Sequence, residues 1–306
     1  MRVFRRAACV LCCFLILGGA VPASPADSPS PARQLPWQPL EKGLDLARMP
    51  LTFIPTPRPA AERANADPAP HASPDVSTTA PPPQPEAVTA TVTVLRIDPE
   101  LFSFSLYMAS ENGPKTFAEL GESEQFAAAI NAGMFLPDGL TNTGYLRSAT
   151  HTNNARVAGN FGAFFVAEPA NPKLPPARLL DKHSDDWQGA LNAYSIVMQN
   201  YRMTTPGGTV IWKQAERLHS IAALGQDKAG NILFILCPSP VPAADFMKAL
   251  LRLPFGLGTV MYLEGGSEAA LFINAGDVKT VESGPHVRKL WGASLSLPNV
   301  LGVKRR

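Results

Sequence analysis

The sequence predicts an α+β protein: one domain with a mixed, strand-rich sheet and a few packed helices, preceded by an N-terminal segment without a core. Strand-like apolar runs outnumber helical ones in the C-terminal two-thirds of the 306 residues, which argues against a doubly wound sheet. Proline divides the chain, since 17 of its 31 prolines lie between Pro22 and Pro85. The formal net charge of +2 excludes a strongly basic nucleic-acid binder.

The first residues have the pattern of an export signal. Three arginines among the first six residues precede an uncharged, mostly apolar run over 7–20, and Val21-Pro22-Ala23 then provides a cleavage site. The apolar run is short for a membrane span. We therefore expect a signal peptide over 1–23 and a periplasmic or extracellular protein. The alternative is an uncleaved N-terminal anchor, which would be the chain's only attachment to a membrane.

Cleavage would change the cysteine content. Cys9, Cys12 and Cys13 would leave with the signal, so Cys237 alone would remain and no intrachain disulfide could form. Cys237 lies in an apolar run and is predicted to be a buried small hydrophobe. The mature protein must then rely on a hydrophobic core for its stability.

Residues 24–87 are rich in Pro, Ala, Ser and Thr and are predicted to be a disordered linker. Its tract 80–85 favours polyproline II. The exception is 37–49 (WQPLEKGLDLARM), whose apolar side chains are suited to docking on the domain. The domain itself is predicted to span 88–306.

The domain begins with a predicted hairpin. Apolar residues alternate with threonines over 88–94, Asp98-Pro99 marks a turn, and 102–108 alternates again. Residues 115–130 are predicted to be helical, with Ser123 as an N-cap inside this stretch. Further strands are predicted at 161–167, 194–199, 209–212, 221–225, 231–237, 259–263 and 269–274, with a turn at 227–230 and a helix at 243–253.

Two glycine-marked segments are candidates for chemistry. In the first, an apolar run ends in Asn131-Ala132-Gly133; in the second, an apolar strand delivers Glu264 directly before Gly265-Gly266. Glycines let the backbone approach another group closely. A carboxylate at the end of a buried strand can have a raised pKa, which suits a general acid. The alternative is structural: a turn cap at Asn131 and an ion-paired Glu264.

Other polar residues have two interpretations each. His219 and Ser220 precede a strand, where they would hold a phosphate, or form an ordinary turn. Asp181, Asp185 and Asp186 would bind a divalent cation, or form a solvated acidic turn.

Gly265-Gly266-Ser267-Glu268-Ala269, followed by Asp277 and His286, has the residue order of a hydrolase nucleophile elbow. That motif requires a helix after the serine, whereas 269–273 predicts a strand. The chain has no P-loop, HExxH or paired CxxC, so no cofactor motif is evident and a divalent cation stays open.

From about Val92 onward the chain resembles the phosphodiester glycosidase family. The similar pieces, in order, are INAGMF with PDG at 137–139, GNFGAFFV at 159–166, VMQNYRM at 197–203, HSIAALGQDKAGNILFI at 219–235 and YLEGGSEAAL at 262–271. The resemblance implies hydrolysis of the bond between a sugar anomeric carbon and a phosphodiester oxygen, with a glycan or phosphosugar as partner. It makes no prediction of the oligomeric state.

The resemblance also implies a set of site residues. The matching positions are Asn131, Gly133, Gln199, Ser220, Glu264, Gly265, Gly266 and Ser267. Glu264 stands where the family has aspartate, His219 stands where arginine is common, and a third glycine is missing.

These residues suggest roles in glycosidic cleavage. Glu264 is expected to act as base or to stabilise positive charge, while His219 and Ser220 hold the phosphate and Asn131 holds sugar hydroxyls. Asp138 is the candidate second carboxylate in the binding region. The rival class is a non-catalytic glycan-binding or structural envelope protein with a vestigial site.

Overall fold

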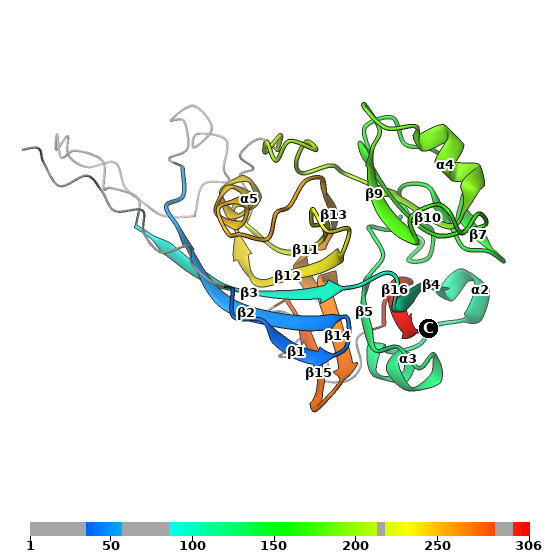
Figure 1. Cartoon of the computed structure of the whole chain (residues 1–306), viewed down its shortest axis with the longest axis horizontal. Coiled ribbons are helices and arrows are strands. Elements are labelled where there is room, and N and C mark those ends of the chain that lie inside the picture. The colour runs from blue at the N-terminus through cyan, green and yellow to red at the C-terminus, as the bar shows by residue number, and fades with distance from the viewer. Residues whose placement is uncertain (1–34, 57–85, 213–217, 285–295) are drawn as a thin grey trace, which may run out of the picture. The chain divides into compact units, whose positions relative to one another are not determined.

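The largest layer is a six-stranded antiparallel sheet with the strand order β1-β2-β3-β12-β11-β13 (Figure 1). Its strands are β1 (Gln38–Glu41), β2 (Leu44–Phe53), β3 (Val88–Ile97), β11 (His219–Gln226), β12 (Ile232–Val241) and β13 (Val260–Gly265). The computed structural model describes residues 35–56, 86–212, 218–284 and 296–306, and all of them belong to the unit Gln34–Arg306. The predicted signal 1–23 and the linker tract 80–85 lie outside these residues.

The sheet begins upstream of residue 88. β2 pairs with β3 over ten positions, from Leu44↔Ile97 to Phe53↔Val88, and its inward side chains are buried. Trp37 packs edge-on against Phe255 with ring centroids 5.7 Å apart. The segment expected to dock on the domain is therefore an integral pair of strands, and the folded unit includes it.

Two further sheets complete the fold, and all their pairs are antiparallel. One has the order β7-β6-β10-β8-β9 and the other the order β15-β14-β5-β16-β4. Their strands are β4 (Phe102–Met108), β5 (Ala128–Asn131), β6 (Leu146–Arg147), β7 (Thr152–Asn154), β8 (Ala163–Pro169), β9 (Ala177–Asp181), β10 (Tyr194–Asn200), β14 (Ala270–Ala275), β15 (Val278–Ser283) and β16 (Asn299–Arg305).

The three sheets share one hydrophobic core. Phe104 of β4 lies with its ring centroid 5.1 Å from that of Phe165 of β8 and 6.4 Å from that of Phe234 of β12, so one ring touches a residue from each of the other sheets. All three side chains are buried. Burying such rings against each other holds the layers together, at about 2 kcal/mol or more per side chain removed from water.

Short helices cover the sheets: α2 (Ala109–Asn112), α3 (Phe117–Ser123), α4 (Trp187–Ala193) and α5 (Ala243–Leu251). α5 packs against the six-stranded sheet through Phe246, Met247 and Leu250. None of the described helices is long and apolar enough to cross a membrane.

The helix predicted at 115–130 is half wrong. α3 begins after Thr116, whose side chain and that of Glu119 form a reciprocal capping box, and it ends at Ser123, so Ser123 is no N-cap. Residues 128–131 instead form β5, which pairs with β14 and β16 on its two sides. Pairing on both edges outweighs the helical propensity of three alanines.

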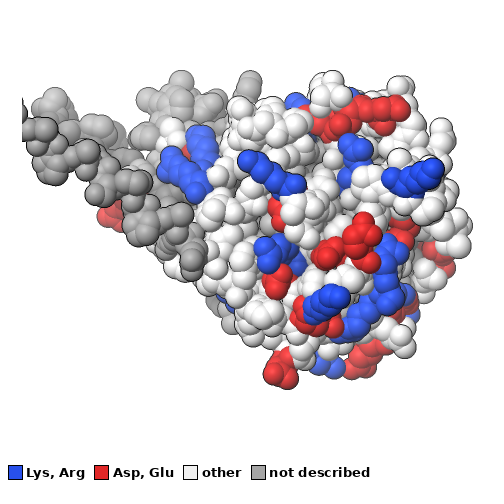
Figure 2. All heavy atoms as spheres, in the orientation of Figure 1, with Lys and Arg blue, Asp and Glu red and all other residues white. Residues whose placement is uncertain are grey.

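The α+β class is confirmed, but with three antiparallel sheets in place of one mixed sheet. This many strands closes around a shared core more readily as packed layers than as one open sheet. The predicted strand at 209–212 is reduced to an isolated bridge between Thr204 and Val210. On the face shown in Figure 2, acidic and basic side chains are interspersed, in keeping with the near-neutral net charge.

Candidate functional site

The candidate site lies where β13 runs into the 3₁₀ turn η1 (Gly266–Glu268). Gly266 has φ +73°, a conformation that favours glycine. A Cβ on Gly265 would lie 2.5 Å from the Tyr262 hydroxyl and 2.8 Å from the Ser220 carbonyl oxygen. The two glycines are therefore needed for different reasons, the first for lack of space and the second for backbone conformation.

Ser220 fixes this turn from the neighbouring strand. Its Oγ donates a 2.5 Å hydrogen bond to the Gly266 carbonyl oxygen, and the residue is buried. Gly284 packs directly against this hydrogen bond. A Cβ there would collide with the Gly266 carbonyl oxygen and lie 2.7 Å from Ser220 Oγ. The hydroxyl that was expected to bind phosphate thus holds the turn in the present structure.

Glu264 is the titratable group at the centre of the site. Its pKa is raised to about 7, chiefly by burial; the Gly265 N–H, which donates to Oε1 over 3.0 Å, lowers the pKa, and the charge of Glu268 adds to the rise. No ion pair joins Glu264 to any residue in the described part of the chain. The structural alternative, an ion-paired Glu264, is therefore not seen there.

Two side chains flank this acid. His219 is exposed at the start of β11, and its Cβ would lie 3.1 Å from a Cβ on Gly265. Tyr262 lies two residues before Glu264; burial raises the pKa of its phenol, and the charges of Glu264 and Glu268 add to that rise. An imidazole, a phenol and two carboxyl groups thus gather at one end of β11 and β13.

An aromatic hairpin over 201–212 covers the outer edge of β13. Its backbone bonds that edge, with the Tyr262 N–H donating to the Tyr201 carbonyl oxygen over 2.9 Å. The Trp212 ring centroid lies 4.9 Å from that of Tyr262 and 6.1 Å from that of Tyr201, and Trp212 Nε1 donates to the Arg202 carbonyl oxygen. The rings of Tyr201, Trp212 and Tyr262 therefore pack together beside the strand that carries Glu264.

The first glycine-marked segment lies against the second through asparagines. Asn131 Oδ1 accepts from the Ala270 N–H over 3.2 Å, just beyond η1. Gly133 has φ +106°, and a Cβ there would lie 3.2 Å from Asn200 Nδ2, which itself donates to the Leu263 carbonyl oxygen. Asn131 and Glu264 are thus joined by short chains of contacts on both sides of the turn.

Asn131 is buried, and its Nδ2 has no hydrogen-bond partner among the described residues. The sequence did not single out Asn142, whose Oδ1 would lie 2.9 Å from a Cβ on Gly133, or Asn200. Asparagines are common in turns, so spacing alone gave no signal for this cluster.

Gln199 does not point into the site. Its Oε1 accepts from the Ala158 N–H, and its Nε2 donates to the carbonyl oxygens of Ala158 and Phe161. The side chain is fully buried and holds the loop between β7 and β8. The structure therefore places this residue as a loop support.

Asp138 lies in an exposed turn of its own. Its carboxylate accepts from the N–H groups of Leu140 and Thr141 and from Thr141 Oγ1 at 2.5–2.9 Å, and these bonds lower its pKa. No contact joins it to Glu264 among the described residues.

The acidic triplet is occupied by structural partners. Asp181 pairs with Arg202, Asp185 pairs with Arg178 at 3.4 Å, and Asp186 caps α4 through the Gly189 N–H. Within the described residues, no group of three or more His, Cys, Asp or Glu side chains is arranged to hold a metal ion. The triplet is thus neither a cation site nor simply solvated.

The elbow interpretation also lacks its structural context. After Ser267 the chain completes η1 and enters strand β14, with no helix following the serine. His286 lies outside the described residues. Cys237 is buried, as predicted, and burial raises the pKa of its thiol to about 12.

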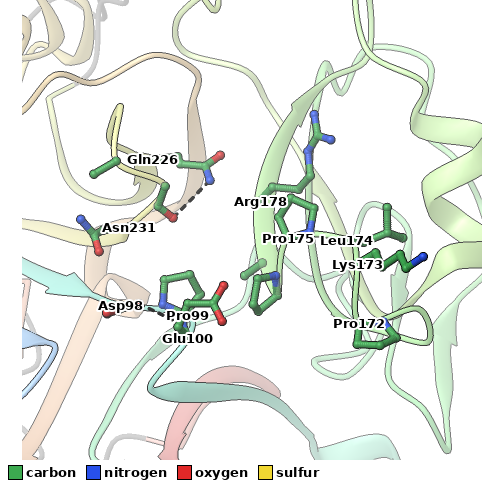
Figure 3. A pocket seen from close by; sticks show the side chains of 14 residues that line it. Asp98, Pro99, Glu100, Pro172, Lys173, Leu174, Pro175, Arg178, Gln226 and Asn231 are labelled. Atoms are coloured by element: carbon green, nitrogen blue, oxygen red, sulfur yellow. Dashed lines mark hydrogen bonds between the residues drawn. The ribbon is translucent and has the colours of Figure 1, made fainter.

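Two surface hollows of about 600 and 900 Å³ lie at the other end of β11, around Gln226. Figure 3 shows the first, with Arg178 and Lys173 on one side and Asn231 and Asp98 on the other. Gln226 there accepts from the Leu179 N–H and donates to the Gly230 carbonyl oxygen, so it supports the surrounding turns. The chemistry-bearing residues gather at the opposite end, which we take as the site.

A comparison with known protein families assigns the chain to one of them. The sequence pattern of the phosphodiester glycosidase family matches residues 124–304, and the chain belongs to that family. No curated protein matches the chain.

Two solved structures share the fold. One is the catalytic domain of zebrafish N-acetylglucosamine-1-phosphodiester alpha-N-acetylglucosaminidase, auto-inhibited by its pro-peptide, at 11% identity, with 85% of this chain and 84% of that chain covered and a TM-score of 0.51. The other is a hypothetical protein from Synechocystis, at 12% identity and a TM-score of 0.54; the match covers 90% of this chain and 64% of that one.

Proposed function

We propose that the chain is an exported hydrolase that cleaves sugar-1-phosphodiester bonds in an envelope or extracellular glycan. The observation that carries the proposal is Glu264, a half-buried carboxyl with a pKa of about 7 at the end of a strand that the family match includes. A general base is most effective when its pKa lies near the working pH. The zebrafish relative's name suggests an N-acetylhexosamine 1-phosphodiester as the first substrate to try.

The reaction needs a general base more than it needs a general acid. A water oxygen bonds to the anomeric carbon as the bond from that carbon to the phosphate oxygen breaks, and the bonding electron pair leaves on the phosphate monoester. Because this leaving group is already a stable anion, it needs little protonation. Glu264 takes the proton from the attacking water, and the products are a free sugar and a phosphate monoester.

The surrounding residues suit the two ends of the substrate. His219, exposed beside Gly265, is the cation that holds the phosphate when protonated. The absence of a Cβ at Gly265 lets Tyr262, Ser220 and His219 pack closely beside the strand end that carries the acid. Asn131 Nδ2, buried and without a hydrogen-bond partner among the described residues, is the donor that we assign to a sugar hydroxyl.

The test uses the whole chain and a panel of hexose and N-acetylhexosamine 1-phosphate alkyl esters, with released sugar as the readout. Turnover by the wild type and its loss in Glu264→Gln are expected. Glu100→Gln, an exposed acid at the other end of the sheet, is the matched control and should keep full activity. Undiminished turnover in Glu264→Gln would remove Glu264 from the reaction.

Retention of the same esters without release of sugar would favour the rival class, a glycan-binding envelope protein. Export has its own measurement. N-terminal sequencing of the secreted protein should find a chain that begins after Ala23, and a chain that retains 1–23 in the membrane fraction would indicate an anchor.

A further inference from the structure

We infer that Glu268 is the second carboxylate of this site and acts beside Glu264 on the sugar. The inference rests on the proposed function and deepens it, because glycoside hydrolysis normally uses a pair of carboxyl groups and the expected partner, Asp138, lies in a separate exposed turn.

The first argument is position. Glu268 ends the 3₁₀ turn that starts directly after Gly265, and its Oε2 would lie 3.3 Å from a Cβ on Gly266. The carboxylate thus folds back over the glycine that follows the acid end of β13. The Ser220 hydrogen bond to the Gly266 carbonyl oxygen holds the backbone of the turn that joins Glu264 to Glu268.

The second argument is charge. Glu264 and Glu268 are both partly exposed, and neither forms an ion pair with a residue in the described ranges. Two neighbouring carboxylates without a cation repel each other, an arrangement that destabilises the fold and is concentrated at functional sites. The charge of Glu268 raises the pKa of both Glu264 and Tyr262, which places the three groups within electrostatic reach.

The third argument is chemical fit. As the bond from the anomeric carbon to the phosphate oxygen breaks, positive charge develops on the sugar ring, and a carboxylate that stays ionised stabilises it. Glu264 takes the proton from water. The titratable groups near it are Tyr262 on its own strand and His219 on β11. Glu268 supplies the negative charge and transfers no proton, so the atoms of the reaction balance as before.

The test compares Glu268→Gln with Glu100→Gln in the whole chain, measuring kcat/KM for an N-acetylhexosamine 1-phosphate methyl ester across pH 4–9. Glu268→Gln is expected to lower kcat/KM about 100-fold. It should also move the midpoint of the rise in activity to lower pH, since Glu264 ionises more easily without its neighbour. Glu268→Asp keeps the charge, so its midpoint should lie between that of Glu268→Gln and that of the wild type.

Carbon-13 NMR titration of the glutamate carboxyls gives a readout besides activity. The Glu264 midpoint should fall in Glu268→Gln and stay unchanged in Glu100→Gln. If the wild type and its Glu264→Gln variant behave as proposed while Glu268→Gln matches the control in both measurements, the inference is overturned and the proposed function stands. A wild type without turnover removes the proposed function and, with it, the catalytic role of Glu268.

Discussion

The Ser220 hydroxyl reaches across from β11 to the carbonyl oxygen of Gly266, 2.5 Å away on the turn that follows β13. One partly buried hydrogen bond thus joins the second strand of the site to the turn that carries Glu268. The sequence had suggested a phosphate ligand at this position, whereas in the structure the Ser220 hydroxyl is bonded to the turn.

Ser220→Ala should therefore loosen the turn. We expect a loss of about 1–2 kcal/mol in the free energy of unfolding, because the partly buried Gly266 carbonyl oxygen loses its donor. kcat should fall more than KM rises, since the turn positions the acids. Ser103→Ala, which removes a serine bond to the Lys304 carbonyl oxygen elsewhere, should leave kcat unchanged. A large rise in KM alone would instead indicate a phosphate ligand.

Gly284 is predicted to be required for lack of space. Gly284→Ala would force the new methyl group into the Gly266 carbonyl oxygen and Ser220 Oγ, at a cost of about 1–3 kcal/mol in stability and with loss of activity. Gly159→Ala is the matched control, because nothing lies within 4 Å of a Cβ there. Equal melting temperatures and rates in the two variants would show that the turn can shift freely.

Glu264 should make the protein less stable as pH rises. Its folded-state pKa of about 7 lies above its ordinary value of 4.5, so the folded state holds the proton more tightly and stability falls between these pH values. The shift corresponds to roughly 3 kcal/mol before solvent screening reduces it. Urea unfolding should find Glu264→Gln more stable than wild type at pH 8 and similar at pH 4. A wild type whose advantage over the variant grew with pH would contradict this sign.

Gln199→Leu should lower the stability of the folded protein. The leucine leaves the Ala158 N–H and the carbonyl oxygens of Ala158 and Phe161 buried without partners, which should lower the free energy of unfolding by about 3 kcal/mol or more. Thermal unfolding measures this directly. A stable variant with a raised KM would restore Gln199 to the binding residues.

The sequence predicted the strands whose patterns are local. Alternation marked β3 and β4, and apolar runs marked β8, β10, β11, β12, β13 and β14. β5 was missed because its alanines favour a helix in isolation, and only pairing with β14 and β16 makes it a strand. β2 was hidden by its proline-rich surroundings, although it buries Leu44 and Leu46 in one core cluster and Met49, Leu51 and Phe53 in another.

Glu264 and its two glycines could be singled out from the sequence because they follow an apolar run, and the structure has them at the end of β13. The roles of Ser220 and Gln199 could not be predicted, because a hydroxyl or amide serves backbone and ligand equally well, and only the direction of the side chain distinguishes them. Glu268 and Gly284 gave no signal, since their importance comes from a turn that brings them beside residues of β11 and β13.

The ten-residue pairing of β2 with β3 bears on how the protein should be handled. A recombinant fragment that starts at residue 88 would lose β2 with its buried side chains of Leu44, Leu46 and Leu51, and the hydrogen-bonding groups on that edge of β3 would be left unpaired. Exposed strand edges of this kind pair with other chains and promote aggregation. Fragments for crystallisation or assay should begin before Leu35, and poor solubility of shorter ones would say nothing about the intact protein.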